Sequence, residues 1–99
     1  MPAVPKPAFD WNDANTGHIA KHKVAPDEAE QVVSGASLLI ETADRSGEDR
    51  YTERGETAAG RLLLVVWTWR GGRIRVVTAF PANRRWRVLW RRIKGGHDA

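Results

Sequence analysis

Two apolar runs separated by a pair of glycines constrain the fold of this 99-residue chain more than any other feature. Residues 61–80 read RLLLVVWTWRGGRIRVVTAF, and both halves are rich in the β-branched and aromatic residues that favour strands. A two-residue type I′ turn requires positive φ at both central positions, which glycine accepts. The stretch therefore predicts a β-hairpin centred on Gly71 and Gly72.

The position of the turn predicts the pairing of the two strands. Trp67 is expected opposite Val76, and the same register continues until Leu63 lies opposite Phe80. Because side chains alternate between the faces of a strand, one face is predicted to be the core. Its residues are Leu63, Val65, Trp67, Trp69, Ile74, Val76, Thr78 and Phe80. The opposite face begins apolar and becomes cationic towards the turn, with Leu62, Leu64, Val66, Val77 and Ala79 followed by Thr68, Arg70, Arg73 and Arg75.

The remaining sequence predicts helices and strands around this hairpin. Asn12 or Asp13 is suited to N-cap a helix that runs to about Lys23. Pro26 is suited to open a second helix, which Gly35 would end in the left-handed conformation. The other expected elements are a strand at 37–42, a loop at 43–49, a weaker strand at 50–57 near a sheet edge and a helix from about 82 to 94.

The final helix is predicted to be amphipathic and strongly basic. Its apolar residues fall within an arc of roughly 100° and are expected to pack on the sheet as core; they are Trp86, Leu89, Trp90 and Ile93. Its cations lie on the flanks of that arc and are Arg84, Arg85, Arg87, Arg91, Arg92 and Lys94. The order of elements predicts an α+β domain with an antiparallel sheet of three to four strands covered by helices.

Composition indicates one small domain. Residues 9–94 form the expected domain, between a disordered N-terminal tail at 1–8, which holds three of the five prolines, and a flexible C-terminal tail at 95–99. The sequence has no run of eighteen apolar residues, so it predicts no membrane span. The absence of cysteine fits the reducing cytoplasm.

Charge is distributed unevenly along the chain. Residues 1–57 have six Lys or Arg against eleven Asp or Glu, whereas residues 58–99 have ten against one. A strongly basic half in a chain with a pI near 10.1 indicates a polyanionic partner, nucleic acid before a membrane, or an acidic protein. The alternative is a basic surface that only keeps the protein soluble.

Several short segments, in their order and spacing, resemble the BrnT family of small ribonuclease toxins from bacterial toxin–antitoxin pairs. They are Phe9-Asp10-Trp11-Asn12, Lys21-His22-x-Val24, Glu28-Ala29-Glu30-x-Val32, Gly55, Gly60-Arg61-Leu62-Leu63, Arg73-Ile74-Arg75-Val76-Val77 and Thr78-Ala79. The resemblance covers most of residues 9–82. It implies a compact fold similar to the RelE-type ribonuclease toxins, RNA cleavage without a metal or other cofactor, and neutralisation by a ribbon-helix-helix antitoxin, BrnA.

The chain departs from the family pattern towards its C-terminus. Members usually read Ser-Ala-Arg where residues 78–80 read Thr-Ala-Phe, and they usually carry Glu, Tyr and Glu where this chain has Trp86, Trp90 and Arg91. These departures leave an alternative open. The chain can be a catalytically inactive relative that keeps the fold and binds a protein partner or nucleic acid.

Metal-free RNA cleavage requires a base for the 2′-hydroxyl, cations for the developing phosphorane charge and an acid for the leaving oxygen. Histidine titrates near neutral pH, so His22 is the candidate base, with Lys21 beside it to stabilise charge. Arg61 and Arg75 are candidate catalytic cations because a planar guanidinium matches paired phosphate oxygens. The predicted nucleic-acid-binding residues are Arg73, Arg84, Arg87 and Arg91.

Each candidate also has an ordinary structural interpretation. His22 can be a helix-face histidine with a satisfied hydrogen bond, and the strand arginines can be paired with Glu41, Glu53 or Glu56. His18 and His22 are four residues apart and can share a metal on one helix face. However, no glutamate lies between them as in H-E-x-x-H and no third ligand is defined, so no metal site is predicted.

Overall fold

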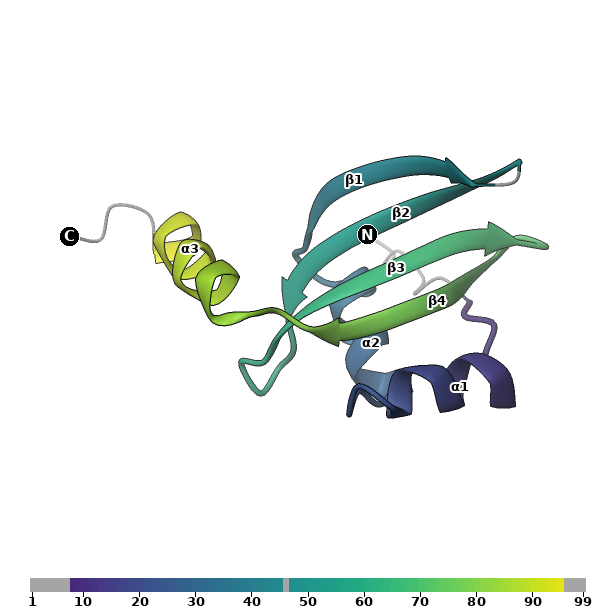
Figure 1. Cartoon of the computed structure of the whole chain (residues 1–99), viewed down its shortest axis with the longest axis horizontal. Helices are drawn as coiled ribbons and strands as arrows, with labels where there is room; N and C mark the ends of the chain where they lie inside the picture. The colour runs from purple at the N-terminus through teal and green to yellow at the C-terminus, as the bar shows by residue number, and fades with distance from the viewer. Residues whose placement is uncertain (1–7, 46, 96–99) are drawn as a thin grey trace, which may run out of the picture.

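The computed structural model describes residues 8–45 and 47–95, and within them it has the predicted α+β class and C-terminal helix (Figure 1). The elements are α1 (Asp13–Ala20), α2 (Pro26–Ser34), β1 (Leu38–Arg45), β2 (Glu48–Glu56), β3 (Leu62–Arg70), β4 (Arg73–Pro81) and α3 (Arg84–Gly95). The four strands form one antiparallel sheet in the order β1-β2-β3-β4. α1 and α2 cover one face of the sheet, and α3 lies beyond its end (Figure 1).

β3 and β4 are joined through Gly71 and Gly72, whose φ angles are 59° and 78°. Near this connection Trp67 lies opposite Val76. Beyond Trp67 the register shifts at a β-bulge, and Thr78 lies opposite Val66. The expected register is therefore wrong over the half of β4 that is remote from the glycines.

The bulge exchanges the faces of residues 78–80. Ala79 lies opposite Val65 and is fully buried, whereas Thr78 and Phe80 are half-buried and share the face of Val66. The expected placement of Thr78 and Phe80 in the core is wrong, and so is the placement of Ala79 outside it. A bulge inserts one residue into the alternation, so every side chain beyond it changes face.

The core lies between the sheet and the two N-terminal helices. Its buried residues are Ile19, Val24, Ala29, Val32, Leu63, Val65, Trp67, Ile74, Val76 and Ala79. Trp67 donates its indole N–H to Glu53 Oε2 at 2.6 Å. Trp69 was expected in the core but is 51% exposed, because it lies at the end of the sheet next to the glycines, where its ring packs edge-on against Trp67.

β1 and β2 are longer than the sequence predicts. The expected loop at 43–49 is instead mostly strand, and Asp44 lies opposite Asp49. The expected edge position of β2 is also wrong, because β1 and β3 pair with it on either side. Ser37 and Val32 approach Gly55 of β2 closely. A Cβ added to this glycine would be 3.0 Å from Ser37 Cβ and 3.2 Å from Val32 Cγ1. Glycine therefore permits close packing here rather than marking an edge.

The helix ends follow from local hydrogen bonds. Asn12 caps α1, since its side chain accepts from Asn15 N at 3.0 Å and Asn15 Oδ1 accepts from Asn12 N at 2.8 Å. α1 ends at Ala20, earlier than the expected Lys23. α2 begins at Pro26 as predicted, but Gly35 has a φ of −101°, so the expected left-handed cap is wrong.

α3 begins at Arg84 and is less buried than its apolar arc predicts. Trp90 is buried and packs with Leu62 and Ala82. Trp86 and Leu89 are 38% and 39% exposed, so their expected place in the core is wrong. The physical reason is the position of α3 beyond the end of the sheet (Figure 1). The Ile93 side chain lies outside the described residues.

Most of the two expected tails, at 1–8 and 95–99, lies outside the described residues. Of the residues in these ranges that are described, the Ala8 carbonyl accepts from Ile74 N at 2.9 Å, and Gly95 is the last residue of α3. Among the described helices, none is long and apolar enough to cross a membrane.

Replacing Trp67 with alanine is expected to lower the free energy of unfolding by about 3–5 kcal/mol, because it empties a buried aromatic position. Trp69→Ala removes the same side chain from a half-exposed position and is the matched control, with an expected loss of about 1 kcal/mol. Urea unfolding followed by far-UV circular dichroism measures both. Equal losses would show that the burial of Trp67 does not stabilise the core as described.

Candidate active site

A cationic cavity lies around the edge of β4, near the end of the sheet that holds the glycines. Its volume is about 350 Å³. α1 contributes to it because this helix packs against β4, the edge strand. The lining residues are Ala14, Asn15 and His18 from α1, Glu48 and Arg50 from β2, Thr68 and Arg70 from β3, and Arg75, Val76 and Val77 from β4. We call this the edge cavity.

His18 brings an exposed imidazole to the edge cavity. Its Nε2 lies 3.1 Å from Thr78 Oγ1, within hydrogen-bond distance. The β-bulge makes this contact possible, because without it Thr78 would face the core. The hydroxyl orients the ring, and a titratable group held in one orientation at a cavity is suited to transfer a proton.

Three arginines line the same cavity as this imidazole: Arg50, Arg70 and Arg75. Arg75 Nη1 lies 3.6 Å from Asp10 Oδ2, and Arg70 Nη2 lies 3.2 Å from Glu48 Oε1. Arg50 Nη2 lies 3.8 Å from the other oxygen of the same glutamate. Two arginines thus share one carboxylate, which leaves positive charge for a ligand. Arg50 Nε is buried and has no hydrogen-bond partner among the described residues.

A second hollow continues the edge cavity across the sheet. It has a volume of about 230 Å³, and Arg50 and Val77 line both spaces. Its other lining residues are Glu41, Ala43, Thr52, Val66 and Thr78, which come from all four strands. The two spaces are therefore neighbours, and between them they are lined by residues from α1 and from all four strands.

His22 and Lys21 lie beside the edge cavity but are not among its lining residues. Both follow the last turn of α1 and are exposed. The His22 ring centroid lies 5.6 Å from that of His18 and 6.1 Å from that of Phe80. Of the predicted catalytic residues, Arg75 lines the cavity, and the His22 ring lies next to that of His18, which also lines it. The Lys21 backbone N–H donates to the His18 carbonyl at 3.3 Å.

Arg61 is not brought to this site. Its Nη1 donates to both carboxylate oxygens of Glu28, at 2.9 and 3.0 Å, and to the Lys23 carbonyl at 2.7 Å. These bonds tie the start of β3 to the start of α2. The Ala25 N–H donates to Glu28, and this bond together with the Arg61 guanidinium holds the pKa of Glu28 below its usual value, although burial opposes the shift.

The predicted RNA-binding residues are on the surface, at two separate places. Arg73 follows Gly72 and is exposed, and Arg84, Arg87 and Arg91 are exposed on α3. Arg87 also donates to the Ala82 carbonyl at 3.2 Å.

The sequence did not point to Arg50 or Glu48, and it made His22 rather than His18 the candidate base. The four-residue spacing of the two histidines was a signal that both lie on the same side of α1. For Arg50 no such signal exists, because its place at the site depends on β2 lying next to β3 in the sheet.

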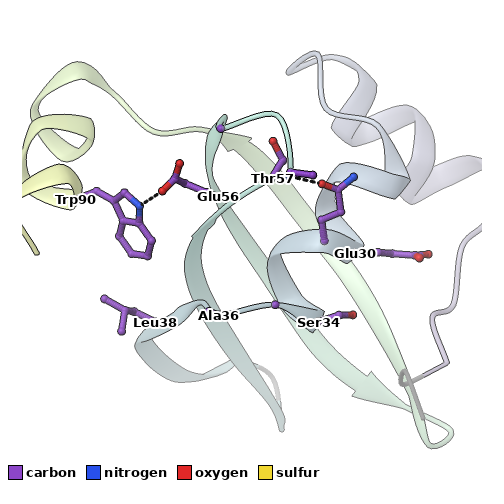
Figure 2. Close-up of a pocket in the computed structure, with 11 residues that line it drawn as sticks. Glu30, Ser34, Ala36, Leu38, Glu56, Thr57 and Trp90 are labelled. Carbon is purple, nitrogen blue, oxygen red and sulfur yellow. Dashed lines mark hydrogen bonds between the residues drawn. The ribbon is translucent and has the colours of Figure 1, made fainter. Parts of the chain in front are cut away.

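A larger hollow with a mainly apolar lining lies elsewhere, between α2, the start of β1, the β2–β3 connection and Trp90 (Figure 2). Its volume is about 730 Å³. Trp90 donates to Glu56 Oε1 at 2.7 Å across one wall, as the dashed line in Figure 2 shows. No histidine or arginine lines it, so it lacks the groups that phosphate chemistry requires.

An oriented imidazole and several guanidinium groups at one cavity define a protein suited to bind and cleave a phosphodiester. Comparison with protein families agrees: the model of the BrnT ribonuclease toxin of type II toxin–antitoxin systems matches residues 11–85. The chain belongs to this family, which confirms the resemblance found in the sequence. No curated protein matches the chain. The family match ends one residue before Trp86, so most of α3 lies outside it.

Glu28→Gln is expected to lower the free energy of unfolding near neutral pH by about 1 kcal/mol or less, as is usual for a partly exposed ion pair. The lowered pKa means that folding favours the ionised carboxylate. This contribution is present above the unfolded-state pKa and is lost as the pH falls through the lower folded-state pKa.

The difference between wild type and Glu28→Gln should therefore shrink below about pH 4. Urea unfolding at a series of pH values measures it, and Arg61→Met, which removes the other partner, is the matched variant. A difference that stays constant down to the lowest pH at which the protein folds would contradict the assignment.

Proposed function

We propose that the protein is an endoribonuclease toxin that cleaves RNA through attack of a 2′-hydroxyl on the adjacent phosphate. The observation that carries the proposal is the grouping of His18 with Arg50, Arg70 and Arg75 at the edge cavity. Membership of a ribonuclease toxin family supports RNA as the substrate. The protein is proposed to act in the cytoplasm, where its substrate RNA is found.

In the proposed reaction His18 removes the proton from the 2′-hydroxyl, and the resulting oxygen attacks phosphorus. Arg75 and Arg50 stabilise the negative charge that develops on the phosphorane. The bond to the 5′-oxygen breaks, leaving a 2′,3′-cyclic phosphate, and the leaving oxygen takes a proton from His22, the imidazole next to His18. Lys21 adds positive charge beside it. All of these groups are side chains of the chain itself, so we propose that cleavage needs no metal.

The exposed arginines are proposed to hold the RNA outside the site of cleavage. Arg73, Arg84, Arg87 and Arg91 would bind phosphates, and affinity would fall as salt rises because each contact releases counterions. The partner that neutralises the toxin is proposed to be a BrnA-like ribbon-helix-helix antitoxin.

One observation favours a second function, a catalytically inactive module that binds RNA or a protein. Arg75 and Arg70 each lie within ion-pair distance of a carboxylate, so part of the charge at the edge cavity is already balanced. The two functions differ in one measurable property, which is whether the wild-type protein cuts RNA.

His18→Ala and His22→Ala are each expected to reduce cleavage by about 10²–10⁴-fold without changing the fold, because each removes a proton-transfer group. Purified variants are assayed on a defined RNA with chelator present, and induced expression in a bacterial host reports growth and total RNA. Arg61→Met is the control: it removes a cation paired with Glu28 and should leave the cleavage rate of the folded protein unchanged.

Normal cleavage by His18→Ala together with loss of cleavage by His22→Ala would move the base to His22. Loss of cleavage by the folded Arg61→Met protein would contradict the placement of the site. If the wild type neither arrests growth nor cuts RNA, the binding module replaces the enzyme.

A further inference from the structure

We propose that Trp86 is a stacking platform for a base of single-stranded RNA, braced from within by the buried guanidinium of Arg54. The proposal rests on the proposed function for the nature of the ligand. It adds a recognition site on α3, a helix that lies almost entirely outside the family match.

Arg54 is a buried cation that lies against two aromatic rings. The residue lies on β2, is only 5% exposed, and its guanidinium carbon lies 4.5 Å from the centroid of Trp86 and 5.7 Å from that of Trp90. Its Nε and Nη1 are buried and have no hydrogen-bond partner among the described residues. A buried charge with unpaired donors is unfavourable, and contact of the guanidinium with the faces of two indoles offsets part of this cost. The arrangement therefore keeps positive charge directly under Trp86.

Trp86 is fixed on one side and accessible on the other. It lies in the first turn of α3, where its backbone N–H donates to Asn83 Oδ1 at 2.9 Å. Arg54 stacks on the ring, yet 38% of the residue remains exposed. Together with Asn83, Arg85 and Leu89 it lines a hollow of about 350 Å³. A rigid aromatic ring that borders an accessible hollow can take a base by stacking, whatever the sequence of the RNA.

The charge of α3 favours RNA as the ligand. Residues 84–95 contain no acidic residue, and five arginines are exposed on this helix: Arg84, Arg85, Arg87, Arg91 and Arg92. Single-stranded nucleic acid is bound by this combination of cations for the backbone and aromatic rings for the bases. An acidic protein segment would satisfy the cations but would leave the flat ring without a matching surface.

The test measures binding of a single-stranded RNA oligonucleotide with methylated 2′-oxygens, which cannot be cleaved by 2′-hydroxyl attack. Trp86→Ala is expected to weaken binding by about 5- to 150-fold, the range that the stacking of one base gives. Trp86→Phe keeps an aromatic ring over Arg54 and should retain most of the affinity. Trp69→Ala is the matched control, since Trp69 is a half-exposed tryptophan at the opposite end of the sheet and should leave affinity unchanged. Far-UV circular dichroism verifies that each variant is folded.

Wild-type affinity in folded Trp86→Ala would overturn the proposal, and so would a loss in Trp86→Phe as large as that in Trp86→Ala. Equal, Trp86-dependent binding of polyglutamate would assign the surface to an acidic protein instead. Equal, Trp86-dependent binding of duplex RNA would overturn base stacking, because paired bases are not available to the ring.

These outcomes separate the platform from the proposed function. If Trp86→Ala binds normally while His18→Ala abolishes cleavage, only the platform fails. If the wild type binds the oligonucleotide through Trp86 but never cuts RNA, only the enzyme fails.

Discussion

The bulge in β4 is the constraint on which both the core and the candidate site depend. Val77 is the extra residue, since Val76 lies opposite Trp67 and Thr78 lies opposite Val66. This insertion puts the small Ala79 side chain into the core and turns the Thr78 hydroxyl away from it. A buried hydroxyl would need a partner inside the core, whereas at the sheet edge Thr78 meets the imidazole of His18. The bulge thus places Ala79 in the core and also brings the Thr78 hydroxyl to the imidazole of His18.

Much of this architecture follows from the sequence, for reasons that are local. Strand alternation, the capping residue Asn12 and the helix-opening Pro26 act over a few residues, so pattern alone predicts the class of the fold and most of its elements. The bulge does not follow, because no residue type near Val77 requires it. The interior position of β2 does not follow either, because Gly55 has the same appearance in a sequence whether it marks an edge or permits close packing.

The candidate site was predictable only in part, for a related reason. Arg61 and Arg75 are both arginines close to sheet strands and within family-like segments, so the sequence treats them alike. Their environments differ because α2 brings Glu28 to Arg61, whereas Arg75 lies at the edge cavity with Asp10 at 3.6 Å. His18 and His22 are about one helical turn apart in the sequence. Thr78 distinguishes them, because its hydroxyl lies within hydrogen-bond distance of the His18 ring. Which residues lie together at the candidate site is decided by contacts between distant segments, and sequence pattern does not predict these contacts.

The structure shows where the acidic residues of the first half of the chain are placed. Carboxylates from the acidic half are used inside the fold: Glu30 accepts from Trp11, Glu53 from Trp67, Glu56 from Trp90, and Glu28 pairs with Arg61. Each of these carboxylates keeps its negative charge but is held in place by a partner from another element of the fold. α3 itself carries exposed arginines and no acidic residue, so positive charge gathers on this helix. Acids of the first half thus hold elements of the fold together, while arginines of the second half are exposed on α3.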